Sequence, residues 1–283
     1  MKTGIVLEGG ALRTIFSAGV CDGLLAGGVM PDYLIGVSAG IAYGVSYLSG
    51  QQGRNLEIAT RFASDRRYMG VSNLLNRRNR SYFGLDFTFR CIPEKLVPFD
   101  YEAFANYPGQ VEAVVTNVTT GQAEYLQVPR QAEESAVLLQ ASCALPLMFP
   151  IIHIGDNGYL DGGVSDGIPF ERALEQGCDR LIVVLTKPRD YVRRPDGALK
   201  LILRRYRRYP EFCQTMCRRA QVYNRSKERL FELERAGKAI VFAPETTRGV
   251  SRTERDVEKL CRLWADGFEQ AGQRLEEVRS FIG

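Results

Sequence analysis

The sequence is poor in the residues that build metal centres and disulfide frameworks. It has a single histidine, His153, and its seven cysteines include no C-x-x-C pair. A zinc site needs about three or four His, Cys or carboxylate ligands at a suitable spacing, and no such set is evident. An odd number of unpaired cysteines is typical of reduced thiols. We therefore expect no metal, no cofactor and a cytoplasmic protein.

Targeting and membrane-spanning segments are not evident either. The first apolar run, Ile5–Leu7, ends at Glu8 and is too short for a signal peptide. Two stretches without charge, Tyr33–Gly53 and Ser135–Gly155, have the length of a membrane span. The first is rich in Gly and Ser, and the second contains two prolines, so both are more typical of a buried α/β core. The apolar content of 45% and the charged content of 25% are ordinary for a soluble globular protein.

The most informative stretch is Gly36-Val37-Ser38-Ala39-Gly40. A short apolar run before it predicts a strand, and the small apolar residues after it predict a helix. Strand, tight turn and helix are the context of a nucleophile elbow, in which Ser38 is strained and its neighbouring glycines avoid steric collisions. The helix N-terminus would favour negative charge on the Ser38 oxygen. Alternatively, the small residues only let a helix pack closely on a sheet.

A second glycine-containing turn, Glu8–Arg13, joins a predicted strand, Thr3–Leu7, to a predicted helix, Thr14–Leu25. Its glycine spacing does not match a dinucleotide-binding fingerprint. It could be a plain tight turn. It could also be an oxyanion hole, in which backbone N–H groups of Gly9, Gly10 and Ala11 stabilise negative charge during acyl transfer.

A third feature is Asp161-Gly162-Gly163, which follows strand-like segments at Phe149–Ile154 and Tyr159–Leu160. An acidic residue at a strand end lies where active-site groups gather in α/β sheets. An isolated Asp-Gly can also be an ordinary turn.

Together these motifs resemble the patatin-like phospholipase family, and in particular its bacterial branch. The resemblance spans about residues 3–186 and includes Ala141-Ser-x-Ala-Leu-Pro-x-x-Phe-Pro150 between the elbow and the Asp-Gly-Gly motif. It implies a three-layer α/β/α fold with a mostly parallel central sheet. It also implies that Ser38 is the nucleophile, that Asp161 is its partner in a dyad, and that Gly9, Gly10 and Ala11 form the oxyanion loop with support from Arg13. The family has a further glycine where Ala11 stands.

The scarcity of histidine bears on the chemistry. His153 lies in the alternating segment Ile151–Ile154 and would need a special fold-back to join Ser38 and Asp161. Without it, Asp161 must act as the base directly, although a free Asp has a pKa of about 3.9. Burial, the helix N-terminus and a strong oxyanion hole could compensate. The predicted function is a serine-dependent lipid acyl hydrolase (phospholipase or esterase); the alternatives are an acyltransferase and a non-catalytic lipid-binding scaffold.

The region Arg54–Pro108 is less regular. It contains a predicted helix at Leu56–Phe62 and a basic stretch with nearby aromatic residues. Such a stretch is usually a solvated surface loop, but a lid or a substrate-entry segment would also sit here. The five arginines of the stretch are Arg66, Arg67, Arg77, Arg78 and Arg80.

The chain is predicted to divide into a catalytic domain, residues 1–187, and a mainly helical extension, residues 188–283, that packs on it. The extension should contain a strand at Ala239–Ala243 and a helix at about Thr253–Phe281. Lys187–Arg229 holds 14 basic and 4 acidic residues, a net charge of +10, interleaved with apolar residues. These arginines could be solvated, or they could contact an anionic membrane at its inner surface. No nucleic-acid-binding motif accompanies the charge, and nothing indicates an oligomeric state.

Overall fold

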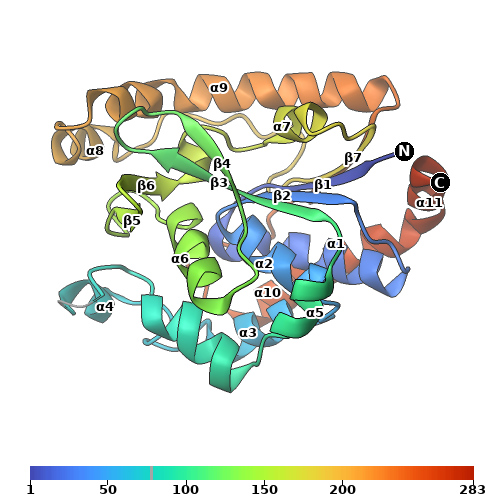
Figure 1. Ribbon diagram of the computed structural model, residues 1–283, viewed down its shortest axis with the longest axis horizontal. Helices are drawn as coiled ribbons and strands as arrows, with labels where there is room; N and C mark the ends of the chain where they lie inside the picture. Colours follow the sequence, from blue (N-terminus) through green and yellow to red (C-terminus); the bar gives the residue numbers. More distant parts are fainter. Residues whose placement is uncertain (77–78) are drawn as a thin grey trace.

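A computed structural model describes residues 1–76 and 79–283 and shows one large mixed sheet between two helical layers (Figure 1). The sheet runs in the order β5-β6-β3-β2-β1-β7-β8, and β4 pairs with the other side of β3. Its five parallel strands are β1 (Thr3–Leu7), β2 (Tyr33–Val37), β3 (Gln110–Asn117), β7 (Arg180–Val184) and β8 (Ala239–Phe242). Its antiparallel strands are β4 (Ala123–Gln127), β5 (Ile152–Ile154) and β6 (Asn157–Asp161).

Helices cover both faces of this sheet because its central strands are apolar on both sides. In β1, Ile5 and Leu7 pack into one core together with Phe16, while Val6 packs into a second core together with Phe170. This alternation is the period of two that a strand imposes on its side chains. The predicted three-layer α/β/α arrangement is therefore confirmed. Below the sheet in Figure 1 lie α1 (Ile15–Ala26), α2 (Ala39–Leu48), α6 (Ala132–Ser142) and α10 (Val257–Gln273), and above it lie α7 (Phe170–Glu175) and α9 (Pro210–Arg235).

The remaining elements are short. They are α3 (Arg54–Phe62), α4 (Val71–Leu75), a π-helix η2 (Phe87–Leu96), α5 (Tyr101–Asn106), α8 (Leu199–Arg205), α11 (Leu275–Ile282) and the 3-10 turns η1 (Ala11–Thr14) and η3 (Gly162–Val164). In the part of the chain that is described, none of the helices is both long and apolar enough to cross a membrane.

The C-terminal part of the chain is mainly helical, but it is also an integral part of the sheet. The predicted strand is present as β8, which lies beside β7 and forms the edge of the sheet. Helix α10 packs closely on α1. A β-carbon on Gly19 would lie only 2.0 Å from the Trp264 carbonyl oxygen, and one on Gly267 would lie only 2.2 Å from that of Phe16, so the contact requires glycine at both positions. This part of the chain therefore contributes to all three layers.

Two local predictions need correction. The single helix expected over about Thr253–Phe281 is two helices, α10 and α11, with a break at Arg274. The strand expected at Phe149–Ile154 is confined to Ile152–Ile154, because Phe149 ends a turn that follows α6 and stacks on Phe83. In addition to these two corrections, the structure shows that most of the apolar residues in the basic segment are buried in the core.

One feature of the sheet decides the geometry of the candidate site. Strand β2 pairs in parallel with β3 and places Val37 opposite Val114, while β6 pairs antiparallel with β3 and places Asp161 opposite Val115. Strand β4 overlaps both of these regions of β3, so β2 and β6 share the other edge. The carboxyl ends of β2 and β6 therefore meet head to head. This register brings Ser38, the residue after β2, close to Asp161.

Candidate active site

The sharp turn predicted at Ser38 is present. Ser38 has φ 55° and ψ −131°, a strained conformation for a residue that is not glycine, and it caps helix α2. A β-carbon on Gly36 would lie 2.6 Å from the backbone nitrogen of Ile41, and one on Gly40 would lie 2.5 Å from the carbonyl oxygen of Leu7. Both glycines are therefore required by close packing, as the elbow motif predicts.

The turn at Ser38 is stabilised by a hydrogen bond to Ser142, a residue to which the sequence analysis gave no role. The backbone N–H of Ser38 donates to Ser142 Oγ at 2.9 Å, and Ser142 Oγ donates to the carbonyl oxygen of Val114 at 2.8 Å. Ser142 is fully buried at the end of α6, within the Ala-Ser-x-Ala-Leu-Pro motif. The motif therefore fixes the elbow to strand β3.

Asp161 is 2% exposed and lies at the end of β6. Its Oδ1 accepts a hydrogen bond from the Gly163 N–H at 2.8 Å, whereas its Oδ2 is buried and has no hydrogen-bond partner among the described residues. Burial raises the pKa of Asp161, while the nearby Ser38 side chain and the charge of Arg219 act in the opposite direction. One oxygen of the carboxyl group thus lacks a hydrogen-bond partner among the described residues, and the Ser38 side chain lies near the group.

The loop Gly9-Gly10-Ala11 lies directly against the elbow. A β-carbon on Gly9 would lie 2.8 Å from Ser38 Cβ. The N–H groups of the three loop residues donate no hydrogen bond to any other residue that the structure describes. Ala11 has φ 50°, which is a left-handed conformation that favours glycine, and this agrees with the glycine that the family pattern has here. The loop therefore lies beside Ser38, with its N–H groups unpaired among the described residues.

Arg13 stabilises the loop through its backbone, since its N–H donates to the Gly10 carbonyl oxygen at 3.2 Å. Its guanidinium group does not brace the loop by a hydrogen bond, because it donates none to the other residues described. The side chain instead lines a cavity on the far side of Ser38.

His153 is not part of this arrangement. It is exposed on β5, at the edge of the sheet, and its backbone pairs with Gly158. It lines neither of the two cavities that include Ser38. A histidine-based triad with His153 has no support in this geometry.

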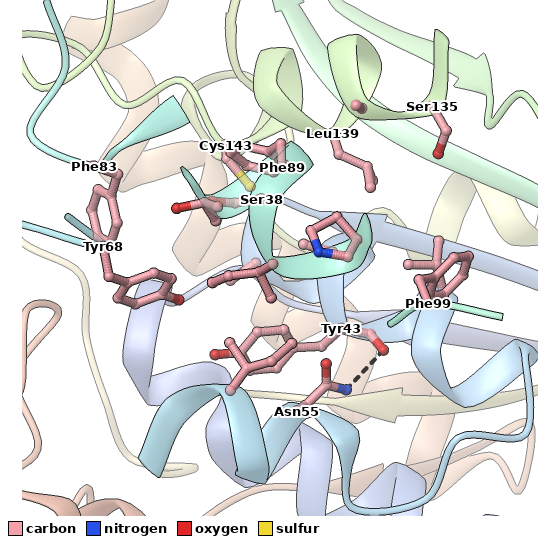
Figure 2. Close-up of a pocket in the computed structure, with 18 of the residues that line it drawn as sticks. Ser38, Tyr43, Asn55, Tyr68, Phe83, Phe89, Phe99, Ser135, Leu139 and Cys143 are labelled. Atoms are coloured by element: carbon pink, nitrogen blue, oxygen red, sulfur yellow. Dashed lines mark hydrogen bonds between the residues drawn. The ribbon is translucent and has the colours of Figure 1, made fainter. Parts of the chain in front are cut away.

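An apolar cavity of about 140 Å³ extends from Ser38 (Figure 2). Figure 2 shows Ser38 beside Cys143, with Phe99 and Asn55 farther along the cavity. One wall is the π-helix η2, which contributes Phe89 and Ile92. Sequence reasoning placed a lid or entry segment in this region but did not identify the wall. The other apolar or aromatic lining residues include Leu12, Tyr43, Ile58, Tyr68, Phe83, Leu139, Leu145 and Phe149.

The structure describes only some of the arginines in the basic stretch of the same region. Arg67 pairs with Asp65 and lies over the ring of Phe87, the first residue of η2. Arg77 and Arg78 lie outside the described residues.

A second cavity on the other side of Ser38 has a different character. It is lined by Asp161, by the loop Gly9–Ala11 and by five basic side chains. Sequence reasoning noted the basic segment but did not place any of its residues at the site. The five basic residues are Arg13, Lys187, Arg193, Arg219 and Arg252.

Comparisons with known proteins agree with the motifs. The family profile described as patatin-like phospholipase matches residues 5–174, and a profile described as a domain of unknown function (DUF6363) matches residues 209–283. The chain is 25% identical over 200 residues to the uncharacterized protein YjjU of Escherichia coli (strain K12), covering 66% of this chain and 52% of that protein. It therefore spans about half the length of this curated relative.

Among solved structures, VipD from Legionella pneumophila is similar, with a TM-score of 0.49 and 15% identity over 98% of this chain and 67% of that one. The matched family is described as one of phospholipases. Because the family profile covers more than half of its length, this chain belongs to the patatin-like phospholipase family.

Proposed function

We propose that this protein hydrolyses carboxylic esters of lipids through a Ser38–Asp161 dyad and an acyl-enzyme intermediate. The observation that carries the proposal is the head-to-head meeting of β2 and β6. It sets a strained serine beside a buried carboxyl group, one oxygen of which has no hydrogen-bond partner among the described residues. A scaffold that only binds lipid has no need of this pair.

In the first half of the reaction, Ser38 Oγ attacks the ester carbonyl carbon while Asp161 Oδ2 accepts the hydroxyl proton. The carbonyl oxygen becomes negative, and the free N–H groups of Gly9, Gly10 and Ala11 are available to stabilise it. The C–O bond to the alcohol then breaks, and the alcohol leaves with the proton held by Asp161. Ser38 is left as an acyl ester.

In the second half, Asp161 removes a proton from water as that water attacks the acyl-enzyme. The ester bond to Ser38 breaks, the serine recovers the proton, and the carboxylic acid is released. Burial of Asp161 assists both steps, because it raises the pKa of the carboxyl group and so makes the group a stronger base.

The apolar cavity provides a place for the acyl chain. It begins at Ser38 and its lining is dominated by aliphatic and aromatic side chains. Burial of a chain there would be favourable by about 0.8 kcal/mol for each methylene group. Activity on long-chain esters should therefore exceed activity on very short ones.

The test is covalent labelling with a fluorophosphonate probe, followed by peptide mapping. We expect one label on Ser38 in the parent protein and none in a folded Ser38→Ala variant, together with loss of esterase turnover. Labelling of a different residue would contradict the assignment of the nucleophile. A folded parent that neither reacts with the probe nor hydrolyses any of a panel of esters would identify a non-catalytic scaffold. Products formed only with an added acceptor alcohol would identify an acyltransferase.

A further inference from the structure

Most of the basic side chains in the cavity beside Ser38 come from the C-terminal part of the chain. Lys187 follows β7, Arg193 lies in the segment after it, Arg219 is on α9, and Arg252 lies between β8 and α10. All four residues lie beyond residue 174, where the patatin-family match ends, and Arg219 and Arg252 lie within the region of unknown function. Only Arg13 comes from the matched part of the chain.

Positive charge exceeds negative charge in this cavity. The carboxylates among or against its basic residues are Glu8, Asp161 and Asp196. Glu8 is already engaged: its Oε2 accepts from the N–H and the hydroxyl of Thr186, and its Oε1 accepts from the Tyr223 hydroxyl. Five basic side chains thus face three carboxylates, one of which is fully hydrogen-bonded.

Most of these basic groups also lack hydrogen-bond acceptors. Arg219 is the exception, because its Nε donates to the Gly163 carbonyl oxygen at 2.7 Å and its Nη1 lies 3.7 Å from Asp196. The charged groups of the other four donate no hydrogen bond and form no ion pair within the described residues, and the Nε atoms of Arg13 and Arg193 are buried without a partner. Buried donors without acceptors are costly, so the cavity is suited to an anion.

Several of these side chains are nevertheless held in place. The Arg193 guanidinium lies 4.3 Å from the ring centre of Tyr223, and the Lys187 ammonium lies 5.2 Å from that of Tyr191. Lys187 is only 8% exposed. Burial, with a smaller contribution from the neighbouring arginines, lowers the pKa of Lys187 to about 7. A bound anion would attract the Lys187 ammonium group and so offset its repulsion by the neighbouring arginines.

The basic cavity adjoins the serine that would attack the ester. It shares Ser38, Ala11 and Leu145 with the apolar cavity, so the two spaces meet at the nucleophile. It also shares Arg193, Arg219 and Arg252 with a larger depression of about 580 Å³. An ester with its acyl chain in the apolar cavity and its carbonyl at Ser38 would extend its alcohol portion toward the basic side chains.

We propose that the basic cavity is a subsite for a phosphate group on the alcohol portion of the substrate, and that the C-terminal part of the chain makes the enzyme selective for anionic lipid esters. This inference rests on the proposed function, because it concerns the same nucleophile. Arg193 and Arg252 are the residues best placed to determine the selectivity, because their guanidinium groups have no acceptor within the described part of the protein. Guanidinium groups also suit the geometry of phosphate oxygens.

The test compares two soluble hexanoyl esters at one ionic strength: hexanoyl glycerol and hexanoyl glycerol phosphate. We expect the parent protein to prefer the phosphate ester by at least about tenfold in kcat/KM, which is the size of one charge-assisted hydrogen bond. The double variant Arg193→Gln, Arg252→Gln should lose most of this preference, mainly through a higher KM for the phosphate ester. Arg252→Gln alone serves as the milder change if the double variant is unstable.

The matched control is Arg225→Gln, Arg235→Gln, which removes the same charge from exposed positions on α9. It should retain the preference of the parent. Equal loss of preference in this control would show that overall charge, rather than the cavity, selects the substrate, and would overturn the proposal.

A second arm uses inorganic phosphate, which should inhibit hydrolysis of the neutral ester competitively in the parent and much less in the double variant. If phosphate instead accelerates the neutral ester while the phosphate ester has no advantage, the cavity is an effector site and the head-group proposal fails. If the parent hydrolyses both esters equally and is labelled at Ser38, the head-group proposal fails and the proposed function stands. If a folded parent hydrolyses neither ester and no probe reacts with Ser38, the proposed function itself fails.

Discussion

The two cavities that meet at Ser38 differ in chemistry and in their origin along the chain. The apolar cavity is built only from residues between Ala11 and Phe149, all within the family match. Most of the basic side chains of the other cavity come from beyond that match. An apolar pocket needs only side chains of suitable size, whereas a cluster of cations must be held together against repulsion. The second cavity therefore depends on the packing of the whole fold.

The two parts of the chain therefore contribute different kinds of side chains to the site. The family-matched part contains the proposed nucleophile, the proposed base and the apolar cavity that we propose for the acyl chain. The C-terminal part contributes the positive charge next to the same serine that we propose discriminates among the alcohols of different esters. The following experiments change residues near Ser38, where the two cavities meet, residues of either cavity, or the exposed basic surface.

The largest effect is expected from Asp161, which lies near Ser38, where the two cavities meet. Asp161→Asn keeps the shape of the side chain but removes the base, so kcat should fall at least about a hundredfold for neutral and anionic esters alike. His153→Ala should keep most of the activity, because His153 is exposed and lines neither cavity. The measurement is kcat on one soluble ester, with circular dichroism to confirm folding. A folded His153→Ala protein without activity would restore a histidine-based triad.

The next effect concerns the apolar cavity alone. Ala136 lines it from α6, so Ala136→Trp should shorten the space for an acyl chain. We expect kcat/KM for a decanoyl ester to fall about tenfold while a butanoyl ester is little affected, since a few methylene contacts at about 0.8 kcal/mol each are lost. Val137→Trp is the control, because Val137 is 39% exposed at the next position of the same helix. Equal losses for both esters would show that the chain does not bind there.

A smaller effect separates the basic cavity from the exposed basic surface. Arg204, Arg205, Arg207 and Arg208 are exposed at and after the end of α8, and we propose that they help the protein contact anionic membranes. Each basic residue near such a surface contributes about 1 kcal/mol, so loss of even one effective contact is about fivefold. Replacement of all four by Gln should weaken binding to phosphatidylserine vesicles at low salt and leave hydrolysis of soluble esters unchanged. Unaltered vesicle binding would remove this proposal.

The smallest effect is on stability and depends on pH. The pKa of Lys187 is lowered to about 7 in the folded protein, so between pH 7 and its ordinary value the unfolded chain binds more protons. Stability contributed by this group therefore rises with pH across that window, and its charge is most destabilising below pH 7. Lys187→Met should raise Tm by several degrees at pH 6 and by much less near pH 10, in a buffer without phosphate. Lys238→Met, at an exposed position, should show no such trend. A gain of equal size at both pH values would contradict the lowered pKa.

Much of the fold was predictable because it depends on local patterns. The strands at Thr3–Leu7 and Ala239–Phe242 and the strand–turn–helix around Ser38 match their expected positions. The break at Arg274 and the shortening of β5 were not predicted; near these ends Arg274 donates to the Val241 carbonyl oxygen and Phe149 stacks on Phe83, contacts between residues far apart in the sequence. The π-helix Phe87–Leu96 was missed as well, since it contains a proline and lacks the period of a regular helix.

By itself, the sequence determined the elbow. Gly36 and Gly40 are the residues that a strained turn at Ser38 requires, and this steric demand acts between neighbours in the chain. Only the tertiary structure decided what surrounds the serine. Asp161 lies near it because β2 and β6 align on the same edge of β3, and Arg193 and Arg252 line the cavity beside it from the segments after β7 and β8. Strand pairing and the gathering of like charges are long-range effects, and no local spacing in the chain encodes them.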